Sequence, residues 1–292
     1  MRRDFLVRFA PGTFVVLWAT GFVGAKYGLP FAEPLTFLAL RFAIVVVILV
    51  LAALVTRAPW PQRPVAFIHS AVSGILIHGI YLGGVFWAIS LGLPAGISAL
   101  VVGTQPLLSA VLSGPLLGER VRAQHWVGLV IGFLGILLVL TPALDSSGLT
   151  ALTPASIGLC IGALIGITLG TIYQKAFSAA ADLRTGGIIQ YSAALAVIGP
   201  AALWLERNTV IWSADFIAVL GWLVIVLSIG AISLLMIIIR HGEISKVATL
   251  FYLVPAVTAL LAWGLFGERL NCLQLGGMGL AAFSVWLVGL RR

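Results

Sequence analysis

His78 and Tyr81 are the residues whose types and spacing most readily support chemistry on a solute. Both lie in an apolar run over 65–89, which is long enough to cross a bilayer as a helix. They are three residues apart, so they project from about the same helical face. A histidine in a membrane core is costly and usually faces a cavity, where it can hydrogen-bond a carboxylate or hydroxyl, or carry a proton. The alternative is a buried histidine satisfied by a backbone carbonyl.

Other polar or aromatic residues are expected at a similar depth. Aromatic rings and hydrogen-bonding groups together would make a wall suited to a zwitterionic or aromatic solute. Taken one at a time, Ser and Thr can instead bond back to their own helix, and Trp or Tyr can face lipid. The further candidates for solute binding are Trp18, Thr20, Gln105, Thr168, Thr171, Ser228 and Tyr252.

The composition places these residues in a membrane protein. Charged residues make up 9% and apolar residues 61% of the 292 residues, and the mean hydropathy is +1.15. A soluble domain of this length needs more charge to cover its surface. A bilayer core of about 30 Å is crossed by about 20 apolar residues in a helix. The sequence therefore predicts an all-α integral membrane protein with ten transmembrane helices, at 10–28, 34–56, 65–89, 95–116, 122–141, 154–177, 184–205, 213–239, 243–266 and 271–290.

The chain contains two copies of one unit. The segment PLLSAVLSGPLLGER at 106–120 recurs 149 residues later as PAVTALLAWGLFGER at 255–269, with seven of 15 positions identical. Five spans fall in each copy, and an odd number of crossings turns the second copy upside down. We predict a first five-helix repeat at 1–141, an outward connecting loop at 142–153 and a second, inverted repeat at 154–292, within one membrane domain. Inverted repeats with a site at their interface are typical of secondary transporters.

The basic residues predict that both termini are cytoplasmic. With that orientation 13 of the 17 Lys and Arg residues fall on the cytoplasmic half, as the positive-inside rule requires. The net charge of +8 is dispersed over the inner loops, so topology explains it and no nucleic-acid partner is predicted. We expect a multi-pass protein of a bacterial inner membrane, with its first span retained.

Two pairs of residues at equivalent positions suggest where the structure bends. Pro106 and Pro255 each remove one backbone donor and disturb the helix ladder, and matched interruptions in both halves indicate a transport pathway or a gating hinge. A static kink that improves packing is the alternative. Gly21 and Gly170 form a second matched pair, which we assign to the same gating elements.

These features resemble the EamA-type branch of the drug/metabolite transporter superfamily. The resemblance rests on the ten spans, the five-helix duplication, and the proline and Gly-Glu-Arg that bracket the ends of spans four and nine. Trp18, Gly21, Lys26 and Arg41 are further marks, and the likeness covers both halves. It implies this fold and the export of small metabolites, amino acids among them. One departure is Gln190, which stands in the second copy where the first has Arg41, so these two positions are not functionally equivalent.

The absent groups constrain the mechanism. The sequence has no GxxxxGK[ST] motif for ATP and no Asp or Glu near the middle of a span, so a carboxylate relay for protons or sodium is missing. We predict an exporter of small metabolites, with aromatic or apolar amino acids as the favoured solutes, that works as an uncoupled alternating-access monomer without cofactor or metal. The alternatives are a proton-coupled multidrug exporter of aromatic cations, an intramembrane enzyme, which lacks HExxH, GxSxG and paired carboxylates, and a channel or scaffold subunit.

Overall fold

The structure is a computed structural model and describes residues 2–93, 98, 101–119, 121–145, 153–241, 244–266 and 271–289. The first repeat contains α1 (Arg2–Gly28), α2 (Pro34–Thr56), α3 (Pro64–Gly74) continuing through the π-helix η1 (Ile75–Leu82) into α4 (Gly83–Ser90), then α6 (Gln105–Leu117) and α7 (Ala123–Asp145). The second contains α8 (Pro154–Tyr173) with η3 (Gln174–Ser178), α9 (Leu183–Leu205), α10 (Ala214–Trp222) with η4 (Leu223–Ala231) and α11 (Ile232–His241), α12 (Ile244–Thr249) with η5 (Leu250–Tyr252) and α13 (Leu253–Phe266), and α14 (Cys272–Gly289).

These elements confirm an all-α membrane fold. Five continuous helices are long and apolar enough to cross a membrane, namely Pro34–Thr56, Pro64–Ser90, Pro154–Ser178, Leu183–Leu205 and Ala214–His241. In the other helices of the described part of the chain the apolar segments are shorter, namely Ala10–Ala25, Gln105–Leu117, Ala123–Val139, Val247–Thr258 and Cys272–Val288. Two differences from the predicted spans stand out. The first helix begins at Arg2 instead of residue 10, and the fourth span is broken by a turn at 103–104 ahead of α6.

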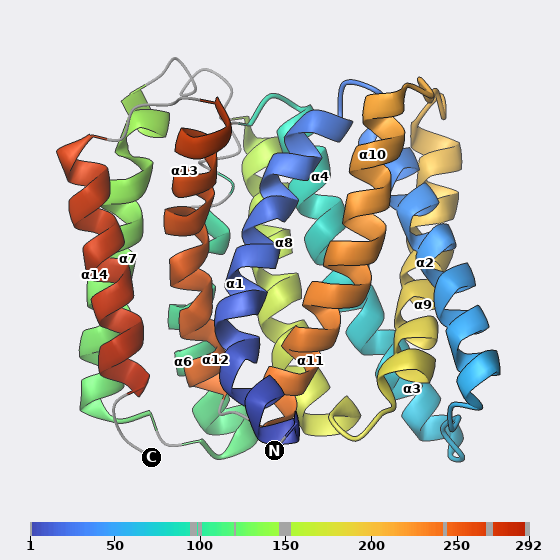
Figure 1. Cartoon of the computed structure of the whole chain (residues 1–292), viewed down its shortest axis with the longest axis horizontal. Coiled ribbons are helices and arrows are strands. Elements are labelled where there is room, and N and C mark those ends of the chain that lie inside the picture. The colour runs from blue at the N-terminus through green and yellow to red at the C-terminus, as the bar shows by residue number, and fades with distance from the viewer. Residues whose placement is uncertain are drawn as a thin grey trace.

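The two repeats run in opposite senses. In Figure 1, α1 begins at the lower edge of the bundle and α8 begins at the upper edge, and α14 ends at the lower edge. Equivalent helices of the two repeats pair with each other, because α2 packs along α9 and α7 packs along α14. Another pair of contacts is exchanged between the repeats, since α1 packs on η4 and α8 packs on η1.

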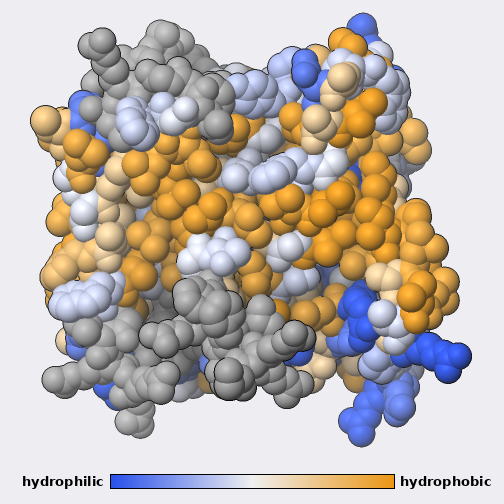
Figure 2. Space-filling view, viewed as in Figure 1, coloured by the Kyte–Doolittle hydropathy of each residue, from blue (hydrophilic) through white to orange (hydrophobic). Residues whose placement is uncertain are grey.

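The helix ends follow from residues that the sequence places between the spans. Pro34, Pro64 and Pro154 each lie in the first turn of a helix, where the missing N–H costs no intrahelical bond. The side chain of Asp182 caps α9 by accepting from the backbone N–H groups of Arg184 and Thr185. Ser213 caps α10 by accepting from the N–H of Phe216. Figure 2 shows the result on the outside, an apolar band with the hydrophilic side chains toward the two edges.

Candidate functional site

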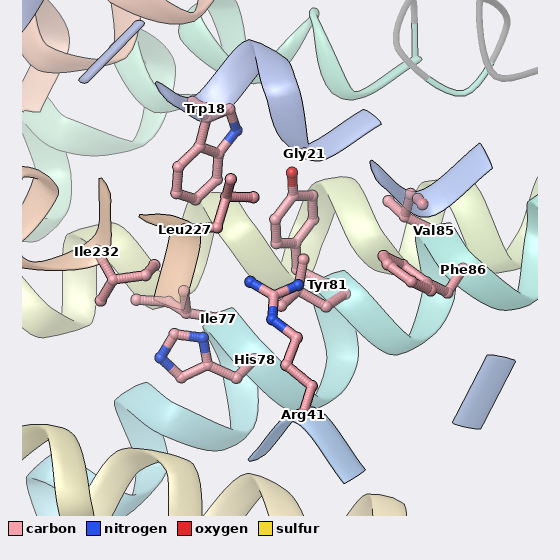
Figure 3. A pocket seen from close by; sticks show the side chains of 12 residues that line it. Trp18, Gly21, Arg41, Ile77, His78, Tyr81, Val85, Phe86, Leu227 and Ile232 are labelled. Carbon is pink, nitrogen blue, oxygen red and sulfur yellow. The ribbon is translucent and has the colours of Figure 1, made fainter. Parts of the chain in front are cut away.

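A small cavity lies between the two repeats at the level of η1 and η4. Its volume is about 30 Å³, which holds no more than a few water molecules. The first repeat supplies α1, α2, η1 and α4 to the wall, and the second supplies η4 and α11. The lining residues are Trp18, Gly21, Ala25, Arg41, Ile77, His78, Tyr81, Leu82, Val85, Phe86, Leu227 and Ile232, and Figure 3 shows how they face one another.

Two π-helical segments at equivalent positions bring side chains to this cavity. η1 carries Ile77, His78 and Tyr81, and η4 carries Leu227. π-Turns are rare and are frequently found at functional sites, so the matched pair supports a role for the cavity, whereas a third π-helical segment, η3, does not line it. Sequence analysis missed both segments. Their sequences, ILIHGIYL and LVIVLSIGA, are apolar like the rest of each span, and hydropathy carries no signal for π winding.

Gly21 and Gly170 allow the repeats to approach each other closely. A Cβ at Gly21 would lie 2.5 Å from Cδ2 of Leu227 in η4, and a Cβ at Gly170 would lie 2.5 Å from Cγ1 of Ile77 in η1. Each glycine therefore packs against the π-helix of the opposite repeat. A larger residue at either position would have to displace that wall.

Aromatic rings form one side of the site. Trp18 and Tyr81 are stacked, with ring centroids 6.3 Å apart and planes at 6°. His78 stacks on Tyr191 of α9, with centroids 4.1 Å apart and planes at 15°. Both ring nitrogens of His78 are buried without a hydrogen-bond partner among the described residues. No described backbone carbonyl satisfies this ring, and the side chain of Gln190 is its neighbouring hydrogen-bonding group.

Arg41 of α2 places a buried cation in the wall. The residue is 2% exposed and its Nε donates to Ser228 Oγ in η4 at 2.8 Å. The hydroxyl of Tyr191 donates to the carbonyl of Ser228 at 3.0 Å, so this contact joins α2, α9 and η4. In Figure 3 the guanidinium of Arg41 points toward Tyr81 and Leu227.

Sequence analysis did not assign Arg41 to the site, although its depth was a usable signal. It follows the first residue of α2, Pro34, by seven positions, which at 1.5 Å per residue is about 10 Å along the helix. A charge at that depth is already inside the apolar layer and must face the protein.

The structure brings three of the predicted solute-binding residues together at the cavity, Trp18, His78 and Tyr81. Ser228 is next to it as the partner of Arg41. Thr168 and Thr171 are buried in α8, where each donates to its own helix, at 2.7 Å to the carbonyl of Leu164 and at 2.9 Å to that of Ile167.

The other three predicted residues lie away from the cavity wall. Thr20 donates to the carbonyl of Leu17 and accepts from Trp222 Nε1 at 3.0 Å. Gln105 is buried at the start of α6. Tyr252 is buried in a separate cluster with Ala110, Leu129 and Ile136.

Pro106 and Pro255 lie at breaks between helical segments. Pro106 is in the first turn of α6, directly after the turn at 103–104, and Pro255 is the third residue of α13, directly after the 3₁₀ turn η5. In α6 the missing N–H of Pro106 lies in the first turn and removes no intrahelical bond. Pro255 follows η5 with no non-helical residue between them, so its missing N–H falls within a continuous helical run. The interruption itself is matched in both repeats. Pro255 also borders a small pocket beside Trp18 and Tyr81.

Comparison with known proteins relates both halves of the chain to one family. The profile of the EamA-like transporter family matches residues 13–141 and again residues 154–290. The chain is 29% identical over 277 residues to YedA of Escherichia coli, described as an uncharacterized inner membrane transporter, with 94% of this chain and 88% of YedA covered. It is 27% identical over 282 residues to a probable amino-acid metabolite efflux pump of Escherichia coli, covering 94% of this chain and 91% of the pump.

A solved crystal structure supports the same fold. It has a TM-score of 0.78 and 19% sequence identity, and the alignment covers 97% of both chains. Because the family profile covers both halves and the relatives match along nearly their whole length, the chain belongs to the EamA-like transporter family and is a membrane transporter rather than an enzyme.

Proposed function

We propose that this protein exports small metabolites, with aromatic or apolar amino acids as the favoured solutes, across a bacterial inner membrane by alternating access. The observation that carries the proposal is the cavity between the repeats, which has an aromatic side with Trp18, His78 and Tyr81, one cation, Arg41, and an otherwise mostly apolar lining. Such a lining suits a solute with an apolar body and a few hydrogen-bonding groups. Relatives named as probable amino-acid metabolite efflux pumps in Escherichia coli and Salmonella typhimurium support the same class of solute.

The size of the cavity argues for a conformational cycle. At about 30 Å³ the cavity has no room for an amino acid, so the repeats must separate before a solute binds. The matched breaks before α6 and at η5 divide the spans beside the cavity into two segments each, which would let the halves move separately. We infer that one five-helix unit rocks against the other, in a monomer with both termini in the cytoplasm.

We further propose that this movement is not coupled to an ion gradient. All nine Asp and Glu residues lie at or outside the ends of the spans, so a carboxylate relay through the core is missing. His78 is the remaining group that could carry a proton at the cavity. Proton coupling through His78, with aromatic cations as cargo, is the second candidate.

The test is uptake of radiolabelled amino acids into proteoliposomes, with and without an imposed pH gradient. We expect saturable uptake that ignores the gradient, and a selective loss of uptake in His78→Ala. Tyr252→Phe is a matched control, because it removes a buried hydroxyl that lies outside the cavity. Uptake that follows the pH gradient and is lost with His78 would refute the uncoupled mechanism, and no uptake by correctly folded protein would refute the choice of solute.

A further inference from the structure

Arg41 is a buried cation without a counter-charge in the described part of the chain. Its only hydrogen bond there runs from Nε to the neutral hydroxyl of Ser228, and the salt bridge described in the structure joins Arg184 and Asp182 instead. The sequence has no Asp or Glu in the middle of a span that could serve as a counter-charge to Arg41. A charge inside a membrane protein is costly unless paired, and it generally marks a solute pathway.

The geometry leaves the two terminal nitrogens of Arg41 for the cavity. Ser228 occupies Nε, and Figure 3 shows the far end of the guanidinium in the space bordered by Tyr81 and Leu227. A guanidinium offers its N–H groups as a planar fork that matches the two oxygens of a carboxylate. The neighbouring walls, Trp18 and Ile77 among them, are apolar or aromatic and suit the remainder of an organic acid.

The second repeat does not balance this charge. Gln190 stands at the position equivalent to Arg41, and its Oε1 is buried without a partner among the described residues. No carboxylate lines the cavity, so a cationic group of the solute would find no opposite charge there. The site therefore compensates one negative charge and leaves any positive charge uncompensated.

We propose that Arg41 binds the carboxylate of the solute and makes the cavity selective for charge, so that a monoanionic carboxylic acid with an aromatic or apolar body binds better than the zwitterion of the same skeleton, and the zwitterion binds better than the decarboxylated amine. This proposal rests on the proposed function and narrows it to carboxylate-bearing solutes. It makes Arg41 the residue that determines specificity, with the aromatic wall as a platform for the solute body.

The test uses three probes that share a phenyl ring and a short chain: 3-phenylpropionate, phenylalanine and phenethylamine. Thermal unfolding of the purified full-length protein is followed as each probe is titrated. We expect the apparent affinity to fall in that order, and to fall by about tenfold or more for the two carboxylates in Arg41→Gln, which loses a charge-assisted pair. Arg41→Gln also introduces the residue that the second repeat carries at the equivalent position. Arg41→Lys keeps the charge but not the planar fork of N–H groups, so its affinity for the two carboxylates should lie between those of Arg41→Gln and the wild type.

The control variant is Arg57→Gln, which removes a basic residue at the end of α2 without touching the cavity. It should leave all three affinities unchanged. Three results would overturn the proposal. They are equal binding of phenethylamine and 3-phenylpropionate, no stabilisation of the protein by either carboxylate, and an Arg41→Gln variant that keeps the wild-type order of affinities for the three probes. Uptake of the same probes into proteoliposomes is a separate measurement. Carboxylate binding that depends on Arg41 without transport of any probe would support the inference and refute the proposed function.

Discussion

The linkers at the two ends of the α2–α9 pair occupy equivalent places in the inverted repeats but are held very differently. The upper linkers, 29–33 and 206–213, meet in an isolated antiparallel bridge between Ala32 and Val210, beside a bond from the N–H of Ile211 to the carbonyl of Phe31 at 2.8 Å. The lower linkers, 57–63 and 179–182, instead border a hollow of about 840 Å³. The upper end of this helix pair is thus closed and the lower end is open.

The difference follows from which residue faces a helix N-terminus. At the upper end, Glu206 accepts from the N–H groups of Leu35 and Thr36 in the first turn of α2, at 2.8 and 2.7 Å. A carboxylate is favoured there by the free N–H groups and by the helix dipole. Its equivalent at the lower end, 149 residues earlier, is Arg57, and a cation cannot accept these bonds.

A second pair of equivalent acids shows the same contrast. Glu33 reaches across to the other upper linker and accepts from the N–H groups of Arg207 and Thr209, at 3.3 and 3.2 Å. Its lower equivalent, Asp182, accepts from Arg184 two residues away and so holds only its own linker. The inverted repeats share a backbone plan, whereas the side chains at the two ends decide which end is closed in this conformation. With the predicted orientation, the closed end is the outer one.

A disulfide across the upper bridge should have the largest effect. Partners in an antiparallel bridge lie about 4.5–5.5 Å apart between Cα atoms, which is within the range for a disulfide. In a background that lacks the two free cysteines, Cys160 and Cys272, Ala32→Cys with Val210→Cys should lose transport on oxidation and recover it with a reductant. The two single variants are the controls. Full transport by the oxidised pair would show that the upper linkers need not separate.

Glu206→Ala should have the second largest effect, because it removes three hydrogen bonds to a carboxylate, two of which cap the first turn of α2. We expect a cost of about 2 kcal/mol to the closed state, roughly a thirtyfold change in its ratio to the open state. Labelling of a cysteine at Val210 by a membrane-impermeant thiol reagent measures this ratio. Glu206→Gln, which keeps one acceptor oxygen, should label at an intermediate rate. Unchanged labelling in both variants would mean that Glu206 does not hold the linkers together.

The limits of helices and the residues that contact each other were not equally predictable from sequence. The predicted span at 34–56 matches α2, Pro34–Thr56, because Pro34 and Arg57 mark its ends in the sequence. The bond between Glu206 and the N–H of Leu35 joins residues 171 positions apart. It depends on the register between two repeats, and no local pattern encodes that register.

In the candidate site, the depth of the residues in the membrane was predictable from sequence, but the direction in which they face was not. The depth of Trp18, His78 and Tyr81 followed from counting along each span, and the three lie at the cavity. Depth alone also selected Thr20 and Tyr252, which face elsewhere. A helix that is apolar all round has no periodic stripe to show which face is turned inward, so the rotation of each helix is set by packing that the sequence does not display.

The equivalent threonines Thr36 and Thr185 allow the two ends to be compared directly. Thr36 Oγ1 donates to the Glu206 carboxylate at 2.7 Å, and Thr185 Oγ1 donates to the neutral carbonyl of Pro59 at 2.7 Å. Bonds to charged groups contribute about 1.5–3 kcal/mol and neutral ones about 1 kcal/mol. Thr36→Val should therefore raise thiol labelling at Val210→Cys more than Thr185→Val raises it at Ala181→Cys, where the lower end is already open. A larger effect at the lower end would reverse the comparison.

The smallest expected effect is that of pH on Glu33. Partial burial acts to raise the pKa of this carboxyl, but the bonds that it accepts from the N–H groups of Arg207 and Thr209 outweigh burial, and the pKa lies below its ordinary value of 4.5. Because the pKa is lower in the closed state, the contribution of Glu33 is complete above pH 4.5 and is lost as the pH falls through the lowered value. Hydrogen exchange of the amides in 206–213, corrected for the intrinsic pH dependence, should show faster opening in this acid range. Glu33→Gln has no charge to titrate, so its opening should not change with pH there, and equal pH dependence in both proteins would exclude Glu33 as the cause.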